Sequence, residues 1–154
     1  MSAGYTVKAG AAIALTAATA KTVLNVINAA NSLIKIVELS ISFDGVTSSA
    51  VPALVELCSS TQATAGTPGS SPTPTQIRGP VRTVQATAGV NYSAEPTVLT
   101  PLKEWLVPVF MGSLTVQFPL GREPEQITTA DGLCLRITAP AAVNVRGYLE
   151  IEEG

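Results

Sequence analysis

Apolar and polar residues alternate with a period of two along much of this sequence, and that pattern most constrains its fold. Successive side chains of a β-strand point to opposite faces, so a half-buried strand shows this period. Four segments follow it closely: residues 35–45, 113–121, 130–140 and 142–153. In the first of them, one face is expected to carry Val37, Leu39, Ile41 and Phe43. Asp44-Gly45 and Asp131-Gly132 supply turn chemistry beside these strands.

Four shorter segments also have strand character: residues 11–16, 21–27, 51–58 and 102–109. Pro108 confines the last of these to a sheet edge or a bulge. No window of ten or more residues carries a convincing helical stripe, since the nearest candidate continues as an alternating run. About eight strands, with both chain ends in the sheets, predict an all-β, two-sheet antiparallel sandwich over residues 1–154, of the jelly-roll type.

The segment at residues 59–80 does not fit this pattern. Its centre, "ATAGTPGSSPTPT" at 63–75, has no charge, no aromatic residue and no aliphatic residue larger than alanine. Such a composition cannot bury enough apolar surface to offset the entropy cost of ordering. We expect an extended loop or arm that joins neither core nor sheet and is held by a neighbouring subunit. The predicted partner-contact residues are Thr67, Pro68, Pro72, Pro74, Ile77 and Arg78.

The composition also indicates an assembly. Charged residues make up 13% of the chain, against about 25% in an average soluble domain, and hydrophobic residues make up 46%. Few charges leave little repulsion to keep copies of a protein apart. A slightly apolar soluble domain is the simpler interpretation, but we favour a surface that other subunits partly cover.

Several partners are not expected from the sequence. The nine basic residues are scattered, so nucleic-acid binding is not predicted, and no apolar run reaches the ~18 residues of a membrane span. The alanine-rich start of the chain is broken by Thr16 and does not predict a secretory leader. Cys58 and Cys134 lack metal-ligand spacing and are expected to be small, semi-buried thiols.

Catalytic chemistry is not expected either. The chain has no histidine, which removes the usual triads, proton shuttles and most zinc sites. Glu123, Glu125 and Asp131 are the only candidates for an acid/base pair, and their proline-broken setting favours solvated loop acids. Trp105 is expected to pack in or between the sheets. We therefore predict no enzyme, no cofactor and no metal.

One pair of residues offers a test of strand register. Glu56 and Arg136 both fall on outward faces of their expected strands, each two residues from a cysteine in sequence. If the two strands are neighbours, a cross-strand ion pair follows.

The runs "VELSISFDGVTSSAVPALVEL", "QFPLGREP" and "RITAPAAVNVRGYLEIEE" resemble small virion proteins of tailed phages, and the likeness covers about residues 22–153. The resemblance implies a β-sandwich or jelly roll without active-site residues. Proteins of this kind that decorate capsids often sit as trimers on the major capsid lattice and reinforce it. It also implies synthesis in the host cytoplasm and a final place on the capsid exterior.

The expected function is therefore that of a capsid decoration, or cement, subunit. Its expected partners are further copies of itself, with a trimer favoured, and a major capsid protein. A phage tail or head–tail connector component is one alternative. A carbohydrate-binding sandwich for receptor recognition is another, although only seven aromatic residues are present to form a sugar platform.

Overall fold

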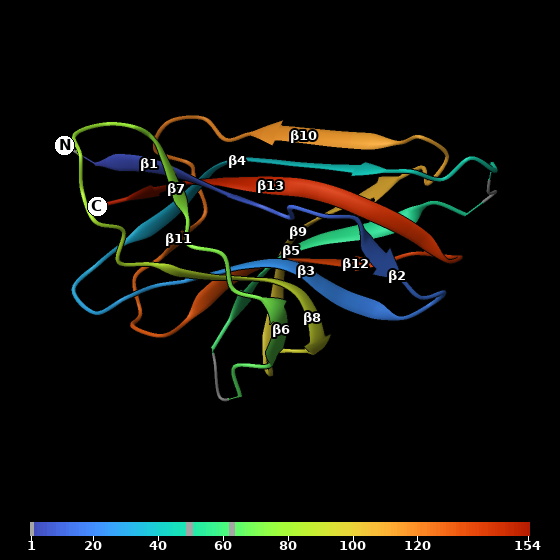
Figure 1. Ribbon diagram of the computed structural model, residues 1–154, viewed down its shortest axis with the longest axis horizontal. Coiled ribbons are helices and arrows are strands. Elements are labelled where there is room, and N and C mark those ends of the chain that lie inside the picture. Colours follow the sequence, from blue (N-terminus) through green and yellow to red (C-terminus); the bar gives the residue numbers. More distant parts are fainter. Residues whose placement is uncertain (1, 49–50, 62–63) are drawn as a thin grey trace.

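The computed structural model describes residues 2–48, 51–61 and 64–154, and within these ranges it contains strands and no helix. The strands form two antiparallel sheets, which confirms the predicted two-sheet sandwich (Figure 1). Sheet A contains β1 (Ala3–Lys8), β2 (Ile13–Leu15), β4 (Ile34–Phe43), β7 (Thr75–Arg78), β10 (Ser113–Gln117), β11 (Glu125–Gln126) and β13 (Val143–Glu153). Sheet B contains β3 (Ala20–Ile27), β5 (Ala53–Ser60), β6 (Thr67–Ser70), β8 (Thr87–Ala94), β9 (Leu99–Val107) and β12 (Gly132–Thr138).

Both chain ends lie in sheet A, as predicted. Its strand order is β10-β4-β13-β1-β7, and β1 pairs with β13 so that Ala3 lies opposite Glu153. The termini therefore sit together at one end of the sandwich (Figure 1). Sheet B has the order β6-β8-β3-β12-β5-β9, with β9 at an edge, where its single proline, Pro101, is tolerated. The jelly-roll assignment stays a prediction.

The core lies between the two sheets and consists mainly of the alternating apolar residues of the predicted strands. Leu39, Ile41 and Leu149 from sheet A are fully buried, as are Leu57 and Leu135 from sheet B. Trp105 lies opposite Val55 in the β5–β9 ladder and packs half-buried against this core. Its predicted packing role is confirmed.

One face assignment is wrong because of a β-bulge. In the β4–β13 ladder, Glu38 pairs with Glu150 but Ile36 pairs with Ile151, so Val37 is an extra residue on β4. Ile36 takes the fully buried position that alternation gave to Val37. A bulge shifts the period by one residue, and side-chain types alone do not reveal it.

The prediction that residues 59–80 join no sheet is also wrong. Residues 59 and 60 end β5, β6 adds to the edge of sheet B beside β8, and β7 adds to the edge of sheet A beside β1. We call residues 64–80 the strap, because they cross from one sheet to the other and close one lateral side of the sandwich (Figure 1). Residues 62 and 63 of this segment lie outside the described residues. Four-residue edge strands need only backbone pairing on one side, so a proline-rich segment can form them.

Candidate interaction surface

Three loops gather at the end of the sandwich opposite the termini. Residues 44–48 follow β4, residues 108–112 connect β9 to β10, and residues 139–142 precede β13 (Figure 1). Because β9 belongs to sheet B and β10 to sheet A, the 108–112 loop crosses between the sheets, as the strap does on the other side.

The 108–112 loop is fixed through the backbone to the end of β4 and the start of the 44–48 segment. Met111 N donates to Gly45 O at 2.9 Å, and Phe43 N donates to Gly112 O at 2.9 Å. Gly45 and Phe110 form an isolated parallel bridge. These backbone contacts hold the 108–112 loop in one conformation.

Two glycines make this packing possible. A Cβ atom on Gly45 would lie 2.2 Å from Val109 O, and one on Gly112 would lie 1.7 Å from Pro108 O. Both distances are too short for any side chain, so the two backbones approach closely only because these positions are glycine.

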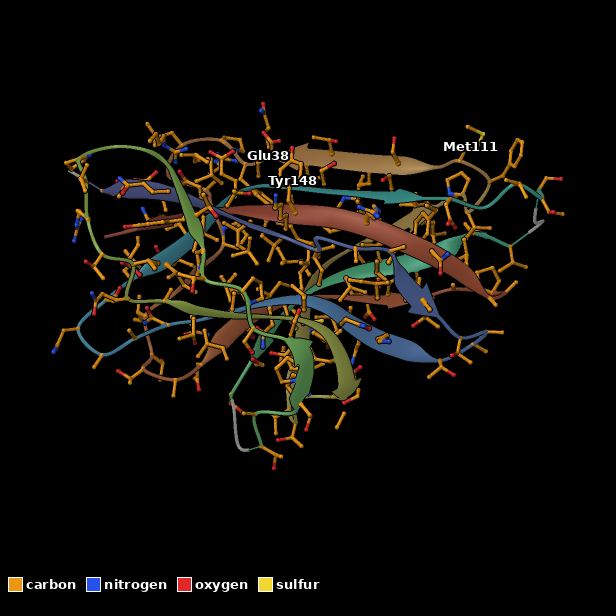
Figure 2. All side chains as sticks on the ribbon, in the orientation of Figure 1. Glu38, Met111 and Tyr148 are labelled. Atoms are coloured by element: carbon orange, nitrogen blue, oxygen red, sulfur yellow. The ribbon has the colours of Figure 1, made fainter. Side chains whose placement is uncertain are left out.

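Met111 itself is held in a conformation that its side chain disfavours. Its φ of +49° lies in the left-handed region, which is uncommon for a residue as bulky as methionine. Backbone strain of this kind, of order 1–3 kcal/mol, persists only where surrounding contacts impose it, and it is often found at functional sites. Met111 is 73% exposed, so its own side chain gains little from the strain within the monomer (Figure 2).

The loop conformation presents apolar side chains to solvent. Phe110 is 48% exposed, and Val46, in the adjacent loop, is 82% exposed. We call Val46, Phe110 and Met111 the apolar tip. Its members come from two loops locked together by the contacts above, so they form a preorganised apolar surface at this end of the molecule.

A hollow of about 540 Å³ lies beside the apolar tip. Val46 belongs to its lining, together with Leu15, Val109, Ala142 and Val143. Asp44 is the one ionisable residue of the lining, and both of its carboxylate oxygens are engaged, by Asn144 N and Asn144 Nδ2, each at 3.0 Å. Because both Asp44 oxygens already accept hydrogen bonds from Asn144, the remaining lining of the hollow suits an apolar or uncharged side chain of a partner.

The apolar tip was missed in the sequence. Phe110 and Met111 continue the apolar run of β9 after Pro108 and resemble the end of a strand. The usable signal is Gly112, which follows the run and marks a tight turn. The left-handed φ of Met111 leaves no trace in the sequence.

The structure places the predicted partner-contact residues on the strap, in unequal environments. Thr67 and Ile77 are exposed, Pro68 and Pro72 are half-buried, and Pro74 is buried. Buried Pro74 has its contacts within this chain, so it does not offer a free surface. Contact of the exposed strap residues with a partner stays a prediction.

Arg78, the last of these residues, is bound to sheet A by ion pairs. Its guanidinium donates to the carboxylates of Glu150 and Glu152 on β13, reaching across β1. Gln76, two residues earlier in β7, also makes two hydrogen bonds: its Nε2 donates to Pro80 O at 2.6 Å, and its Oε1 accepts from Arg82 N at 3.3 Å. The Arg78 ion pairs therefore attach the strap to sheet A of its own subunit, and the Gln76 bonds hold the chain at the end of the strap.

The outer face of sheet A is polar and hydrogen-bonded across its strands. Tyr148 Oη and Gln117 Nε2 both donate to the Glu38 carboxylate, the latter at 2.6 Å (Figure 2). These bonds, that of Tyr148 first, lower the pKa of Glu38. The same bond raises the pKa of Tyr148, because it favours the protonated phenol. Glu38, Gln117 and Tyr148 therefore satisfy one another on this face.

The residues considered for catalysis are not assembled into a site. Glu123, Glu125 and Asp131 make no ion pair within the described ranges, and Glu125 lies in the two-residue strand β11. The part of the chain that the structure describes contains no cluster of three potential metal ligands and no helix long and apolar enough to span a membrane. Searches of protein-family models, curated proteins and solved structures found no match to this chain.

Proposed function

We propose that this protein is a non-enzymatic structural subunit of a virus particle, of the capsid decoration type, which self-associates and reinforces a shell of major capsid protein. The observation that carries the proposal is the apolar tip, where a strained loop holds apolar side chains in solvent. The proposed place of action is the capsid exterior, after synthesis in the host cytoplasm.

Three features support an assembly role for the apolar tip. Met111 keeps an unfavourable backbone conformation while its side chain remains 73% exposed. Burial of this side chain therefore does little to offset the strain in the monomer, whereas contact with a partner would bury it. The neighbouring hollow offers a partly apolar receptor for a side chain from a second molecule. The chain has only 13% charged residues, so little electrostatic repulsion opposes contact between copies.

The mechanism is burial of apolar area at a preorganised surface. Each Å² of apolar surface removed from water contributes about 25 cal/mol, from which the cost of association must be subtracted. A loop already fixed by backbone hydrogen bonds loses little further entropy on binding, which lowers that cost. A trimer is the favoured form, with the tips in or beside its interfaces.

Self-association of the purified chain tests the proposal directly. Analytical ultracentrifugation at micromolar concentration should show an oligomer for the natural sequence, and the double variant Phe110→Ser/Met111→Ser should shift it towards monomer. Leu120→Ser is the matched control, because Leu120 is 94% exposed in a loop at the other end of the sandwich. A natural chain that stays monomeric throughout this range, or an oligomer that the control weakens as much as the double variant, would count against the proposal.

A further inference from the structure

Cys58 and Cys134 lie directly opposite one another on neighbouring strands, β5 and β12. Both point to the outer face of sheet B, since their neighbours Leu57 and Leu135 belong to the core between the sheets. Both cysteines are fully buried, so this outer face is covered at their position.

Residues 92–95, at and just beyond the end of β8, form a two-stranded ribbon with β6, and the Tyr92 and Glu95 side chains of this ribbon reach the outer face of sheet B. Asn91 has a φ of +56°, and β8 pairs with β3 over residues 87–90 and with β6 over residues 90–94. Tyr92 then lies over Gly89, where an added Cβ would meet the phenol oxygen at 2.5 Å. We call this element the cover ribbon.

Two polar contacts attach the cover ribbon to sheet B. Asn25 Nδ2 donates to Tyr92 Oη at 3.0 Å, and Asn25 lies opposite Cys134 in the β3–β12 ladder. At the end of the ribbon, Thr22 N donates to Glu95 Oε1 at 2.8 Å. The Tyr92 contact therefore sits one strand away from the thiols.

The geometry of the ladder suits a covalent bond between the two sulfurs. Directly opposed residues of antiparallel strands have Cα atoms about 4.5–5.5 Å apart, which falls within the 4.4–6.8 Å that a disulfide spans. Both side chains project from the same face of the ladder at paired positions, so the two sulfurs lie beside one another across it.

We propose that Cys58 and Cys134 form a cross-strand disulfide in the folded protein when an oxidant passes the cover ribbon. The sequence predicted two small, semi-buried thiols, and the structure shows that both are fully buried. The bond would connect β5 and β12, two adjacent inner strands of sheet B. This proposal is independent of the apolar tip and of any role in a capsid.

The directions of the pKa shifts favour Cys58 as the first sulfur to react. The hydrogen bond from Cys134 lowers the pKa of Cys58, and the nearby Arg136 guanidinium acts in the same direction, whereas the pKa of Cys134 is raised. Burial of the thiol opposes this lowering of the Cys58 pKa, and so do the charges of the nearby acids Glu56 and Glu95. The net effect leaves Cys58 with more thiolate, which is the nucleophilic form.

A dipyridyl disulfide is a suitable oxidant and probe. The Cys58 thiolate attacks one sulfur of the reagent, which forms a mixed disulfide and expels one thiopyridone. Cys134 then attacks the Cys58 sulfur, forms the protein disulfide and expels the second thiopyridone. The two thiols lose two electrons to the reagent's S–S bond, and their two protons end on the two thiopyridones.

The stoichiometry and mass of the product test the proposal. The folded natural chain should release two thiopyridones and lose two hydrogens in mass, with no pyridyl group attached and with full reversal by dithiothreitol. Cys58→Ala and Cys134→Ala should each release at most one thiopyridone and keep a single pyridyl adduct when they react. A natural chain that keeps two pyridyl adducts, or that releases no thiopyridone while folded, would overturn the proposal.

The rate of the reaction tests the cover ribbon. Tyr92→Phe removes the bond that Asn25 donates to the cover ribbon and changes no charge near the thiols, so it should speed thiopyridone release roughly fivefold, which corresponds to the loss of one neutral hydrogen bond. Tyr148→Phe, on the outer face of sheet A, is the matched control and should leave the rate unchanged. Equal rates in the natural chain and Tyr92→Phe would overturn the gating part of the proposal.

Discussion

Arg136 lies directly opposite Glu56 in the ladder between β12 and β5, with its Nε and Nη2 atoms both 3.1 Å from Glu56 Oε1. The side chains are 23% and 10% exposed, so the pair is largely removed from solvent. It sits two residues from the opposed cysteines in the same ladder and on the same face. A slip of this ladder by one residue would separate both pairs at once, so the ion pair and the thiols depend on one register.

Removing one partner of this ion pair should cost more than removing a partner of an exposed pair. Glu56→Ala leaves the Arg136 guanidinium half-buried without its acceptor, and we expect a loss of about 2 kcal/mol in the free energy of unfolding. Glu150→Ala is the control, since it breaks an ion pair with Arg78 whose side chain is 41% exposed, and it should cost at most about 1 kcal/mol. Urea denaturation of the two variants measures both values, and equal losses would contradict this account.

The Glu56–Arg136 pair is an example of a contact that could be predicted from the sequence. Alternation placed both residues outward, and the β5–β12 pairing confirms the predicted ion pair. The sheets and core followed from the same alternation, because burial of one face imposes the period. The strap could not be predicted this way, since its strands pair through the backbone at sheet edges and bury few side chains. The apolar tip depends on close backbone contacts at Gly45 and on the φ of Met111, which composition does not encode.

Deleting residues 66–75 should destabilise the fold rather than merely remove an appendage. The deletion removes β6 and the buried Pro74, uncovers Tyr92, and prevents Gln76 and Arg78 from being held beside β1. We expect a loss of several kcal/mol in unfolding free energy, because ladder hydrogen bonds and buried surface disappear together.

The control for the strap is Ile77→Ser, which changes a strap side chain that is 49% exposed and leaves the backbone pairing intact. It should change stability by less than about 0.5 kcal/mol. Thermal and urea unfolding followed by circular dichroism give both values. A deletion variant as stable as Ile77→Ser would show that the strap is an independent arm, as the sequence first suggested.

The Glu38–Tyr148 bond should make stability depend on pH in the acid range. The pKa of Glu38 in the folded protein lies below its ordinary value of 4.5. A depressed carboxyl pKa contributes stability that is fully present above the ordinary value and is lost as the pH falls through the folded value. Tyr148→Phe removes the main cause of the shift, so the pKa of Glu38 should rise towards its ordinary value and the acid loss of stability should become smaller.

An NMR titration of the Glu38 carboxyl group in the natural chain and in Tyr148→Phe measures this effect. Ser42→Ala is the matched control, because Ser42 lies on the same face of β4 two positions beyond Ser40 and takes no part in the Glu38 bonds. It should leave the titration unchanged. A Glu38 pKa that is the same in Tyr148→Phe and in the natural chain would show that the phenol does not hold the carboxylate.

Met111→Gly should raise stability and lower self-association in the same variant. Glycine adopts a φ of +49° without the steric cost that methionine bears, so relief of strain should raise the unfolding free energy by about 0.5–1 kcal/mol, after the greater chain entropy of glycine is subtracted. The variant also removes a side chain that is 73% exposed at the apolar tip, so the oligomer should dissociate at higher protein concentration than in the natural chain. Met111→Asn, which tolerates the left-handed region and keeps a side chain, should show the same two directions with less gain in stability.

Urea denaturation and ultracentrifugation on the same samples measure the two effects separately. If methionine at this position served folding alone, it would not lower the stability of the monomer while strengthening association. If both variants unfold more easily and associate as the natural chain does, Met111 serves the fold, and the apolar tip is not the surface through which copies meet.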